Sequence, residues 1–383
     1  AQELMDCIGV KFNDLNKCRD AASAEGFAGY SLFQNLIAGG QNKEGEDVTN
    51  DLSIMCIQAS MHVHLPAPSL SVRVWNGSPH EFLIKAAELT RTGIGLPAYY
   101  NDEVIIPALQ NRGLSLEDAR DYNIIGCVEP QKAGKTEGWH DAAFFNMCRP
   151  LELVFANGMD KGEIVGIPTG DVTQMKSFEE FFDAYKKQME YCISLLVNAD
   201  NAIDVAHAER CPLPFLSCMI DDCLKEGRSV QEGGAVYNFT GPQGFGIANM
   251  ADGLFAIRKL VYEEKKVSME EFKEALAWNY DKGLDAQSAG DMTEMIMKAM
   301  QKAGKEADAS TAAGLLKTFI GMKPGEQKTQ RFKEIHDMID EVPKFGNDIP
   351  EIDYFAREVA YTYSKPLQNY SNPRGGRFQA GLY

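Results

Sequence analysis

Strand-like and helix-like patterns alternate along the chain, and this alternation limits the folds that the chain can adopt. Residues 68–75, PSLSVRVW, alternate with a period of two, which predicts a strand. Ser115-Leu-Glu-Asp118 and Ser177-Phe-Glu-Glu180 have capping-box form, which predicts that a helix begins after each serine. The run from Tyr122 to Ile125 is of the β type and leads into Gly126. The order of these patterns predicts an α/β fold.

Two further stretches have a clear local pattern. Apolar residues recur at a spacing of three to four from Phe178 to Leu196, so one face of that helix is apolar and Cys192 is expected in the core. Residues 233–255 predict a strand, a glycine-rich turn and a helix. Residues from 280 to about 330 are rich in Lys, Glu, Gln, Ala and Met, and we interpret them as a helical insertion.

Composition excludes several classes of partner. The 383 residues are 44% hydrophobic, enough for a large core, and carry a formal net charge of -17. A field of that sign repels nucleic acid and anionic lipid, so neither is expected as a partner. The chain has no apolar run long enough to span a bilayer. Its nine cysteines form no CxxC pair, which predicts reduced, mostly buried thiols and a cytoplasmic location.

Three short motifs suggest ligand sites that their surroundings do not support. Gly134-Lys-Thr136 lacks the glycine that a phosphate loop needs five residues earlier, where Glu129 stands. Gly244-Phe-Gly-Ile-Ala-Asn249 lacks the third glycine of a dinucleotide fingerprint, so a structural turn is favoured. His62 and His64 would share one face of a strand but have no evident third ligand, so packing or hydrogen bonding is favoured and no metal site is expected.

Residues 124–145 concentrate reactive side chains in one short segment. Cys127 and Glu129 are two positions apart, so an extended backbone places both on the same face. A carboxylate raises the pKa of a nearby thiol, which disfavours a thiolate nucleophile but permits hydrogen-atom transfer by a neutral thiol. On the residues alone, this role and that of a buried loop cysteine are equal alternatives.

The segment Gly126-Cys-Val-Glu-Pro130 resembles the active-site loop of glycyl radical enzymes, the family of pyruvate formate-lyase and the radical dehydratases. Similar matches occur in order along the chain, at 39–53, 68–77, 198–217, 238–254, 345–348 and 372–383. The resemblance implies that residues 1–383 are a portion of a ten-stranded α/β barrel domain with surrounding helices. The family's RVxGY-type radical-glycine motif is not found, so we expect a longer polypeptide that carries that glycine and the start of the barrel elsewhere.

The resemblance also implies a subfamily. Val128 stands where pyruvate formate-lyase has a second cysteine, which argues against acyl transfer, and Cys-x-Glu is the pattern of the eliminating lyases. Asp141 and its neighbours resemble glycerol and propane-1,2-diol dehydratases, in which this aspartate holds a substrate hydroxyl. A competing interpretation makes Asp141 the cap of a helix that begins at Ala142. The resemblance implies catalytic roles for Cys127, Glu129 and Asp141, and substrate contacts at the three positions Phe33, His140 and Tyr383.

The function implied is that of a B12-independent lyase that dehydrates propane-1,2-diol or glycerol to an aldehyde through a Cys127 thiyl radical, with Glu129 as base. No bound cofactor is expected. The implied partners are the diol, a radical S-adenosylmethionine activase with an iron-sulfur cluster that installs the glycyl radical, and a second copy in a homodimer. Enclosure in a bacterial microcompartment is an open alternative to the free cytoplasm. Alternative functions are a glycyl radical C–N or C–S lyase acting on choline or isethionate, and a radical-dead structural homologue.

Overall fold

The computed structural model describes residues 1–15, 21, 25, 34–126, 129–281 and 326–382. Contacts divide the chain into two compact units, each built from segments distant in sequence. The first unit contains Ala1–His140, Ile203–Gly241 and Ser371–Gly381. The second contains Asp141–Ala202, Pro242–Tyr370 and Leu382–Tyr383. The assignment of residues 1–383 to one barrel domain stays a prediction.

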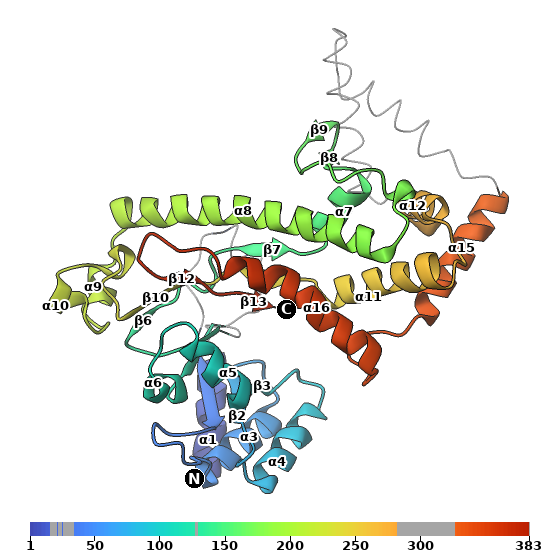
Figure 1. Ribbon diagram of the computed structural model, residues 1–383. Coiled ribbons are helices and arrows are strands. Elements are labelled where there is room, and N and C mark those ends of the chain that lie inside the picture. The colour runs from blue at the N-terminus through green and yellow to red at the C-terminus, as the bar shows by residue number, and fades with distance from the viewer. Residues whose placement is uncertain (16–20, 22–24, 26–33, 127–128, 282–325, 383) are drawn as a thin grey trace. The chain divides into compact units, whose positions relative to one another are not determined.

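The first unit begins with a parallel three-stranded sheet in the order β1-β2-β3 (Figure 1). Its strands are β1 (Asn35–Gly39), β2 (Ser69–Val74) and β3 (Ala98–Asn101), and β2 confirms the strand predicted at 68–75. Parallel neighbours need a crossover connection, which α3 (Asp51–Val63) and α4 (His80–Thr90) supply. The core between these elements is made of the following buried residues: Ala38, Cys56, Ile57, Leu70, Val72, Phe82, Ala86 and Leu89.

The remaining elements of the first unit are short. Its other helices are α1 (Gln2–Asn13), α5 (Asp102–Gln110), α6 (Leu116–Arg120), α9 (Pro214–Ser217) and α10 (Cys223–Glu226). Its other strands are β4 (Asn123–Ile125), β5 (Glu129–Gln131), β6 (Thr136–Glu137), β10 (Tyr237–Thr240) and β12 (Arg377–Phe378). Strands β4 and β5 form an antiparallel pair, and β12, β10 and β6 form a parallel sheet in that order. These two small sheets carry the segment from 124 to 140.

A buried ion pair anchors the chain where it enters β4. Nε and Nη2 of Arg73 donate to the two carboxylate oxygens of Asp102 at 2.9 and 2.8 Å, and the hydroxyl of Tyr122 donates to Asp102 at 2.8 Å. The Arg73 guanidinium lies 3.9 Å from the centroid of the Tyr122 ring and also donates to the carbonyl of Arg120 at 2.7 Å. Strand β2, helix α5 and the start of β4 are thereby joined through one charged group.

The second unit surrounds an aromatic core. Its helices are α7 (Arg149–Phe155), α11 (Ile247–Ile257), α12 (Met269–Ala277), α15 (Glu326–Glu341) and α16 (Pro350–Leu367). Helix α8 runs from Phe178 to Arg210, and its residues from Ile203 onward belong to the first unit. The strands are β7 (Phe144–Asn146), β8 (Met159–Asp160), β9 (Glu163–Ile164), β11 (Gln243–Phe245) and β13 (Gly381–Leu382). Aromatic rings in mutual contact include those of Phe178, Phe181, Phe182, Tyr262, Phe255 and Phe355.

Several local predictions are confirmed. The Ser115 hydroxyl accepts a hydrogen bond from the Asp118 amide at 3.1 Å and opens α6. The Ser177 hydroxyl accepts from the Glu180 amide at 3.3 Å, before α8. Gly246 has φ of 93° between β11 and α11, a backbone geometry suited to glycine, which confirms a structural turn at 244–249.

Other predictions need correction. Cys192, expected in the core, is half-buried. Of the seven described cysteines only Cys56 and Cys223 are buried, so the prediction that most thiols are buried was wrong for this part of the chain. His62 lies in the last turn of helix α3 instead of on a strand, and its ring pairs with Asp6 at 3.0 Å. The interpretation of 280–330 as an insertion concerns residues mostly outside those described.

The fold class was correct at its coarser level. Within the described ranges, helices and mostly parallel strands form a mixed α/β structure, and the sheets contain two or three strands. A ten-stranded barrel is not seen in this part of the chain. Among the same residues, no helix combines the length and the apolar character needed to cross a bilayer.

Candidate active site

Glu129 is the first residue of strand β5. It pairs with Ile125 across the antiparallel strands and is buried, with 8% of its surface exposed. Gly126 has φ of 58°, and a Cβ atom built on it would lie 3.1 Å from Oε2 of Glu129. The Glu129 carboxyl group therefore faces the backbone of the residue that precedes Cys127.

Three of the six residues predicted for the site lie outside the described residues: Phe33, Cys127 and Tyr383. The other three, Glu129, His140 and Asp141, are described. Glu129 and His140 belong to the first unit, and Asp141 belongs to the second. The strands on either side of Cys127 in the sequence end at Ile125 and begin at Glu129, which confirms the β-type run predicted before Gly126.

His140 is enclosed by backbone. A Cβ atom built on Gly138 would lie 2.2 Å from Nε2 of His140 and 2.6 Å from Oε1 of Gln131 on β5. A Cβ atom built on Gly241 would lie 2.8 Å from Nδ1 of the same ring. The ring centroid of Phe239 is 6.3 Å from that of His140. These contacts place His140 beside the strand that carries Glu129.

Burial controls the charge of His140. Loss of water around the ring lowers its pKa from 6.5 to about 4, and the positive charge of Arg374 acts in the same direction. The imidazole is therefore neutral near pH 7. A neutral imidazole can donate one hydrogen bond and accept another, which suits contact with a substrate hydroxyl.

Asp141 follows in a turn of the second unit. Its carboxylate is exposed and accepts a hydrogen bond from Nε2 of buried Gln243 at 3.0 Å. The chain then enters strand β7, which pairs in parallel with β11, with Phe144 opposite Gln243. No helix begins at Ala142, so the interpretation of Asp141 as a helix cap was wrong. A carboxylate has several lone pairs, so the bond that orients Asp141 is compatible with contact to a ligand.

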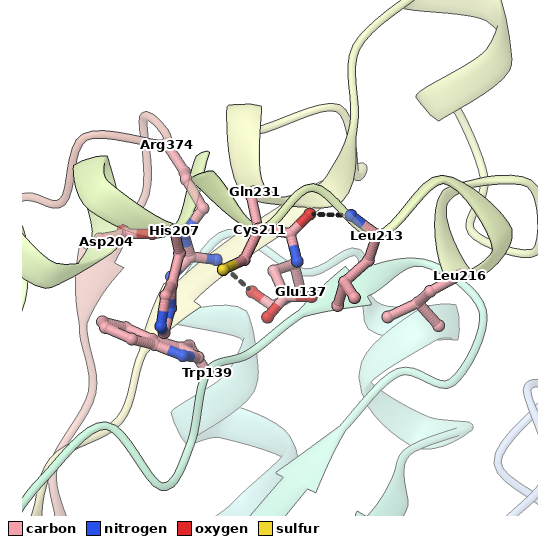
Figure 2. A pocket seen from close by; sticks show the side chains of 9 residues that line it. All are labelled: Glu137, Trp139, Asp204, His207, Cys211, Leu213, Leu216, Gln231 and Arg374. Atoms are coloured by element: carbon pink, nitrogen blue, oxygen red, sulfur yellow. Dashed lines mark hydrogen bonds and ion pairs between the residues drawn. The ribbon is translucent and has the colours of Figure 1, made fainter. Parts of the chain in front are cut away.

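A cavity of about 320 Å³ lies in the first unit next to the segment that ends at His140 (Figure 2). Its lining residues are Glu137, Trp139, Asp204, His207, Cys211, Leu213, Leu216, Gln231 and Arg374. The Cys211 thiol points toward the Glu137 carboxyl group in Figure 2. Burial raises the pKa of Glu137, although the charge of Arg374 opposes that change. The His207 ring meets the Trp139 ring edge-on, with 5.5 Å between the ring centroids.

Sequence reasoning missed the buried pair of Arg374 and Asp204. Both residues stand in segments that carry the family resemblance, 198–217 and 372–383, but their pairing joins positions 170 apart. The lysine of the rejected phosphate loop has a structural partner, because Lys135 bonds both oxygens of Asp118 at 3.0 Å. Within the described residues, no group of three or more His, Cys, Asp or Glu side chains is arranged to hold a metal ion.

Comparisons with known proteins show which family the chain resembles. The family model described as "Pyruvate formate lyase-like" matches residues 1–383. The chain is 65% identical, at a TM-score of 0.90, to a solved structure whose description names 1,2-propanediol dehydration in Roseburia inulinivorans. It is 51% identical, at a TM-score of 0.79, to the glycerol-bound B12-independent glycerol dehydratase of Clostridium butyricum. Both matches cover 100% of this chain, but only 46% and 42% of those chains.

A curated relative extends the comparison. The (2S)-3-sulfopropanediol dehydratase of Klebsiella oxytoca is 38% identical over 287 residues, which are 73% of this chain and 34% of that protein. The chain therefore spans about a third of this relative's length, and less than half the length of each solved structure.

Proposed function

Because the chain belongs to the pyruvate formate lyase-like family, we propose that it is part of a glycyl radical dehydratase acting on propane-1,2-diol or glycerol. The proposal draws on the two solved structures at 65% and 51% identity, which are described by reactions of these diols. It includes the finer fold assignment, in which these residues contribute to the ten-stranded barrel of the family. It also includes a cytoplasmic location and homodimer formation.

The proposed reaction uses Cys127 and Glu129 in sequence. The stored glycyl radical, installed by a radical S-adenosylmethionine activase, supplies the unpaired electron that makes the Cys127 sulfur able to take a hydrogen atom. Cys127 removes hydrogen from C1 of the diol, and Glu129 accepts the proton of the C1 hydroxyl, which the neighbouring radical makes far more acidic. The C2 hydroxyl leaves as water and takes the proton that Glu129 accepted, helped by hydrogen bonds from Asp141 or His140, so that Glu129 is a carboxylate again. Hydrogen returned from Cys127 to C2 completes the aldehyde.

The observation that carries the proposal is the burial of Glu129 with its carboxyl group facing Gly126. A general base must lie within hydrogen-bond reach of the proton that it takes. The position of the carboxyl group, facing the residue before Cys127, supports this role for Glu129. In a hydrolase that used a thiolate, the same carboxylate would oppose ionisation of the thiol.

His140 and Asp141 are proposed to hold the substrate hydroxyls. The lowered pKa of His140 leaves the ring neutral, so it can donate to the departing hydroxyl without placing a fixed charge in the site. The Asp141 carboxylate, held by Gln243, can accept from a hydroxyl. Phe33 and Tyr383 are proposed as walls of the same site.

A comparison of substrates tests this proposal directly. The full-length polypeptide, activated under anaerobic conditions, is incubated separately with propane-1,2-diol, glycerol, (2S)-3-sulfopropanediol, choline and isethionate. We expect propanal from propane-1,2-diol or 3-hydroxypropanal from glycerol, at a higher kcat/KM than for any other compound. Absence of aldehyde from both diols, together with release of trimethylamine or sulfite from the last two compounds, would assign the chain to the alternative lyases.

Two matched variants distinguish loss of the base at Glu129 from loss of a carboxylate charge elsewhere on the protein. Glu129→Gln keeps the size of the side chain but cannot accept a proton, whereas exposed Glu117→Gln on α6 changes charge at the surface. The glycyl radical is quantified by electron paramagnetic resonance in each variant, so that loss of activity is not confused with loss of activation. Full activity of Glu129→Gln at equal radical content contradicts the assigned role.

A further inference from the structure

Arg374 is the most extensively bonded charged group near His140. It is buried, with 4% of its surface exposed, at the turn before β12. Its Nε donates to both carboxylate oxygens of Asp204 on α8, at 3.1 and 2.9 Å. The outer nitrogens donate to main-chain groups, so one guanidinium is shared among three segments of the first unit.

Two of these main-chain acceptors lie in the strands that flank His140. Nη1 of Arg374 donates to the Glu137 carbonyl at 3.0 Å, three residues before His140 on the β6 segment. Nη2 donates to the Phe239 carbonyl and to the Thr240 hydroxyl on β10, the latter at 3.0 Å. The Gly241 amide donates to the Trp139 carbonyl at 3.0 Å, which closes the connection on the far side. The guanidinium therefore bridges the two backbone segments that enclose the imidazole, β6 and β10, which also pair directly.

Only arginine has the shape for this set of bonds. The guanidinium is planar and presents its donors in a fixed fork, while a lysine ammonium is a compact point charge with three donors at one atom. Asp204, itself 4% exposed, supplies the negative charge that a buried cation needs. Asp204, Arg374 and Glu137 all line the cavity of Figure 2, so the ion pair borders open space as well as packed backbone.

We propose that Arg374 is a positioning residue, which holds the β6 and β10 segments at the spacing that places His140 for substrate contact. The expected effect of Arg374 on kcat/KM rests on the proposed function, whereas its expected effect on the backbone does not. Arg374 does not touch the reacting atoms in this proposal. It acts through the backbone at Glu137 and Phe239, and Asp204 acts only through Arg374.

The structural part is tested by hydrogen exchange with mass spectrometry on the full-length polypeptide. Arg374→Gln removes the fork, and Arg377→Gln is the matched control, because Arg377 lies in the same Arg-Gly-Gly-Arg turn but is exposed. We expect faster amide exchange in peptides that cover 136–141 and 237–241 for Arg374→Gln, and wild-type exchange for Arg377→Gln. Peptides that cover β2 and α3 serve as an internal control and should not change. Unchanged exchange at 136–141 would overturn the inference.

The kinetic part is tested by a double-mutant cycle with His140. A misplacement of about 1 Å can cost about 100-fold in rate, so we expect Arg374→Gln to lower kcat/KM by about that factor. Arg374→Lys should recover part of the loss, and Arg377→Gln should stay within about twofold. If Arg374 acts through His140, the Arg374 change costs far less once His140→Gln is present, so the two losses are not additive. Additive losses, or an Arg374→Gln enzyme within about twofold of wild type, contradict the proposal.

The hydrogen-exchange and kinetic tests together distinguish failure of the Arg374 proposal from failure of the proposed function. If wild-type protein dehydrates neither diol, the dehydratase assignment fails, and hydrogen exchange still decides whether Arg374 holds the segment. If Arg374→Gln does not fold, Arg374→Lys and Asp204→Asn carry the same tests. Arg374→Lys keeps a cation at position 374, and Asp204→Asn keeps the arginine. Both are then expected to raise exchange at 136–141 above that of wild type, and wild-type exchange in both overturns the inference.

Discussion

Replacement of Asp102 by asparagine tests whether the buried pair with Arg73 stabilises the chain before β4. Asp102 is fully buried and Arg73 is 5% exposed, so water cannot solvate an uncompensated guanidinium there. The substituted asparagine would keep the size of the side chain but lose the negative charge and one of the two acceptors used at 2.9 and 2.8 Å. Breaking a buried pair by removing one partner typically costs about 3–5 kcal/mol, and we expect the free energy of unfolding to fall by that amount.

The assay is urea unfolding followed by far-ultraviolet circular dichroism, with the slope against urea compared between proteins. Glu103→Gln is the matched control, because Glu103 is the next residue on α5 and is exposed, so a change of about 0.5 kcal/mol or less is expected. Tyr122→Phe removes one hydrogen bond to the carboxylate but leaves the pair, and should cost about 1.5–3 kcal/mol. A loss below about 1 kcal/mol for Asp102→Asn, at an unchanged slope, would refute the reasoning.

The remaining predictions concern the site and its glycines. Glu129→Gln should lower kcat by about 100- to 10,000-fold at equal radical content, measured as aldehyde formed. His140 binds its proton less tightly when folded than when unfolded, since its pKa falls from 6.5 to about 4. Its contribution to stability is therefore present above pH 6.5 and is lost as the pH falls to about 4, by roughly 3 kcal/mol in all. His140→Gln should flatten the pH dependence of unfolding by that amount. Gly253 lies in open space within α11, so Gly253→Ala should raise the free energy of unfolding by about 0.5–1 kcal/mol. At Gly376 a Cβ atom would lie 1.3 Å from the Asn238 carbonyl oxygen, so Gly376→Ala should prevent normal folding. Thermal unfolding compares the two, and equal behaviour would contradict the contacts described.

Local patterns predicted the elements well because each depends on neighbouring residues. Ser115 and Ser177 cap helices through amides three positions away, and β2 needs only a period of two. The mistaken cap at Asp141 shows the limit of such patterns. An acidic residue before small residues suits a helix start, but pairing of β7 with β11, about a hundred residues later, decides the outcome.

The candidate site could be proposed from sequence where one segment carries it and not where distant segments meet. The spacing of Cys127 and Glu129 predicted a shared face, which stays a prediction because Cys127 lies outside the described residues, whereas Glu129 is described and buried. Nothing local to Arg374 reveals its partners, because Asp204, Glu137 and Phe239 reach it from three other parts of the chain. Their pairing depends on the sheet of β12, β10 and β6, whose short strands carry little pattern of their own.

The glycines around His140 give this position a value for protein engineering. Gly138 and Gly241 leave no space for a side chain, so main chain forms much of the wall against which the imidazole packs. The Gly241 amide donates to the Trp139 carbonyl at 3.0 Å, and main chain held in this way cannot rotate into a vacancy as a side chain can. Truncation to His140→Ala should thus leave a vacancy of fixed outline, shaped for a five-membered ring. Such a vacancy is suited to complementation by added imidazole or by triazoles of graded basicity, which would let the proton affinity at this position be varied without further change to the polypeptide.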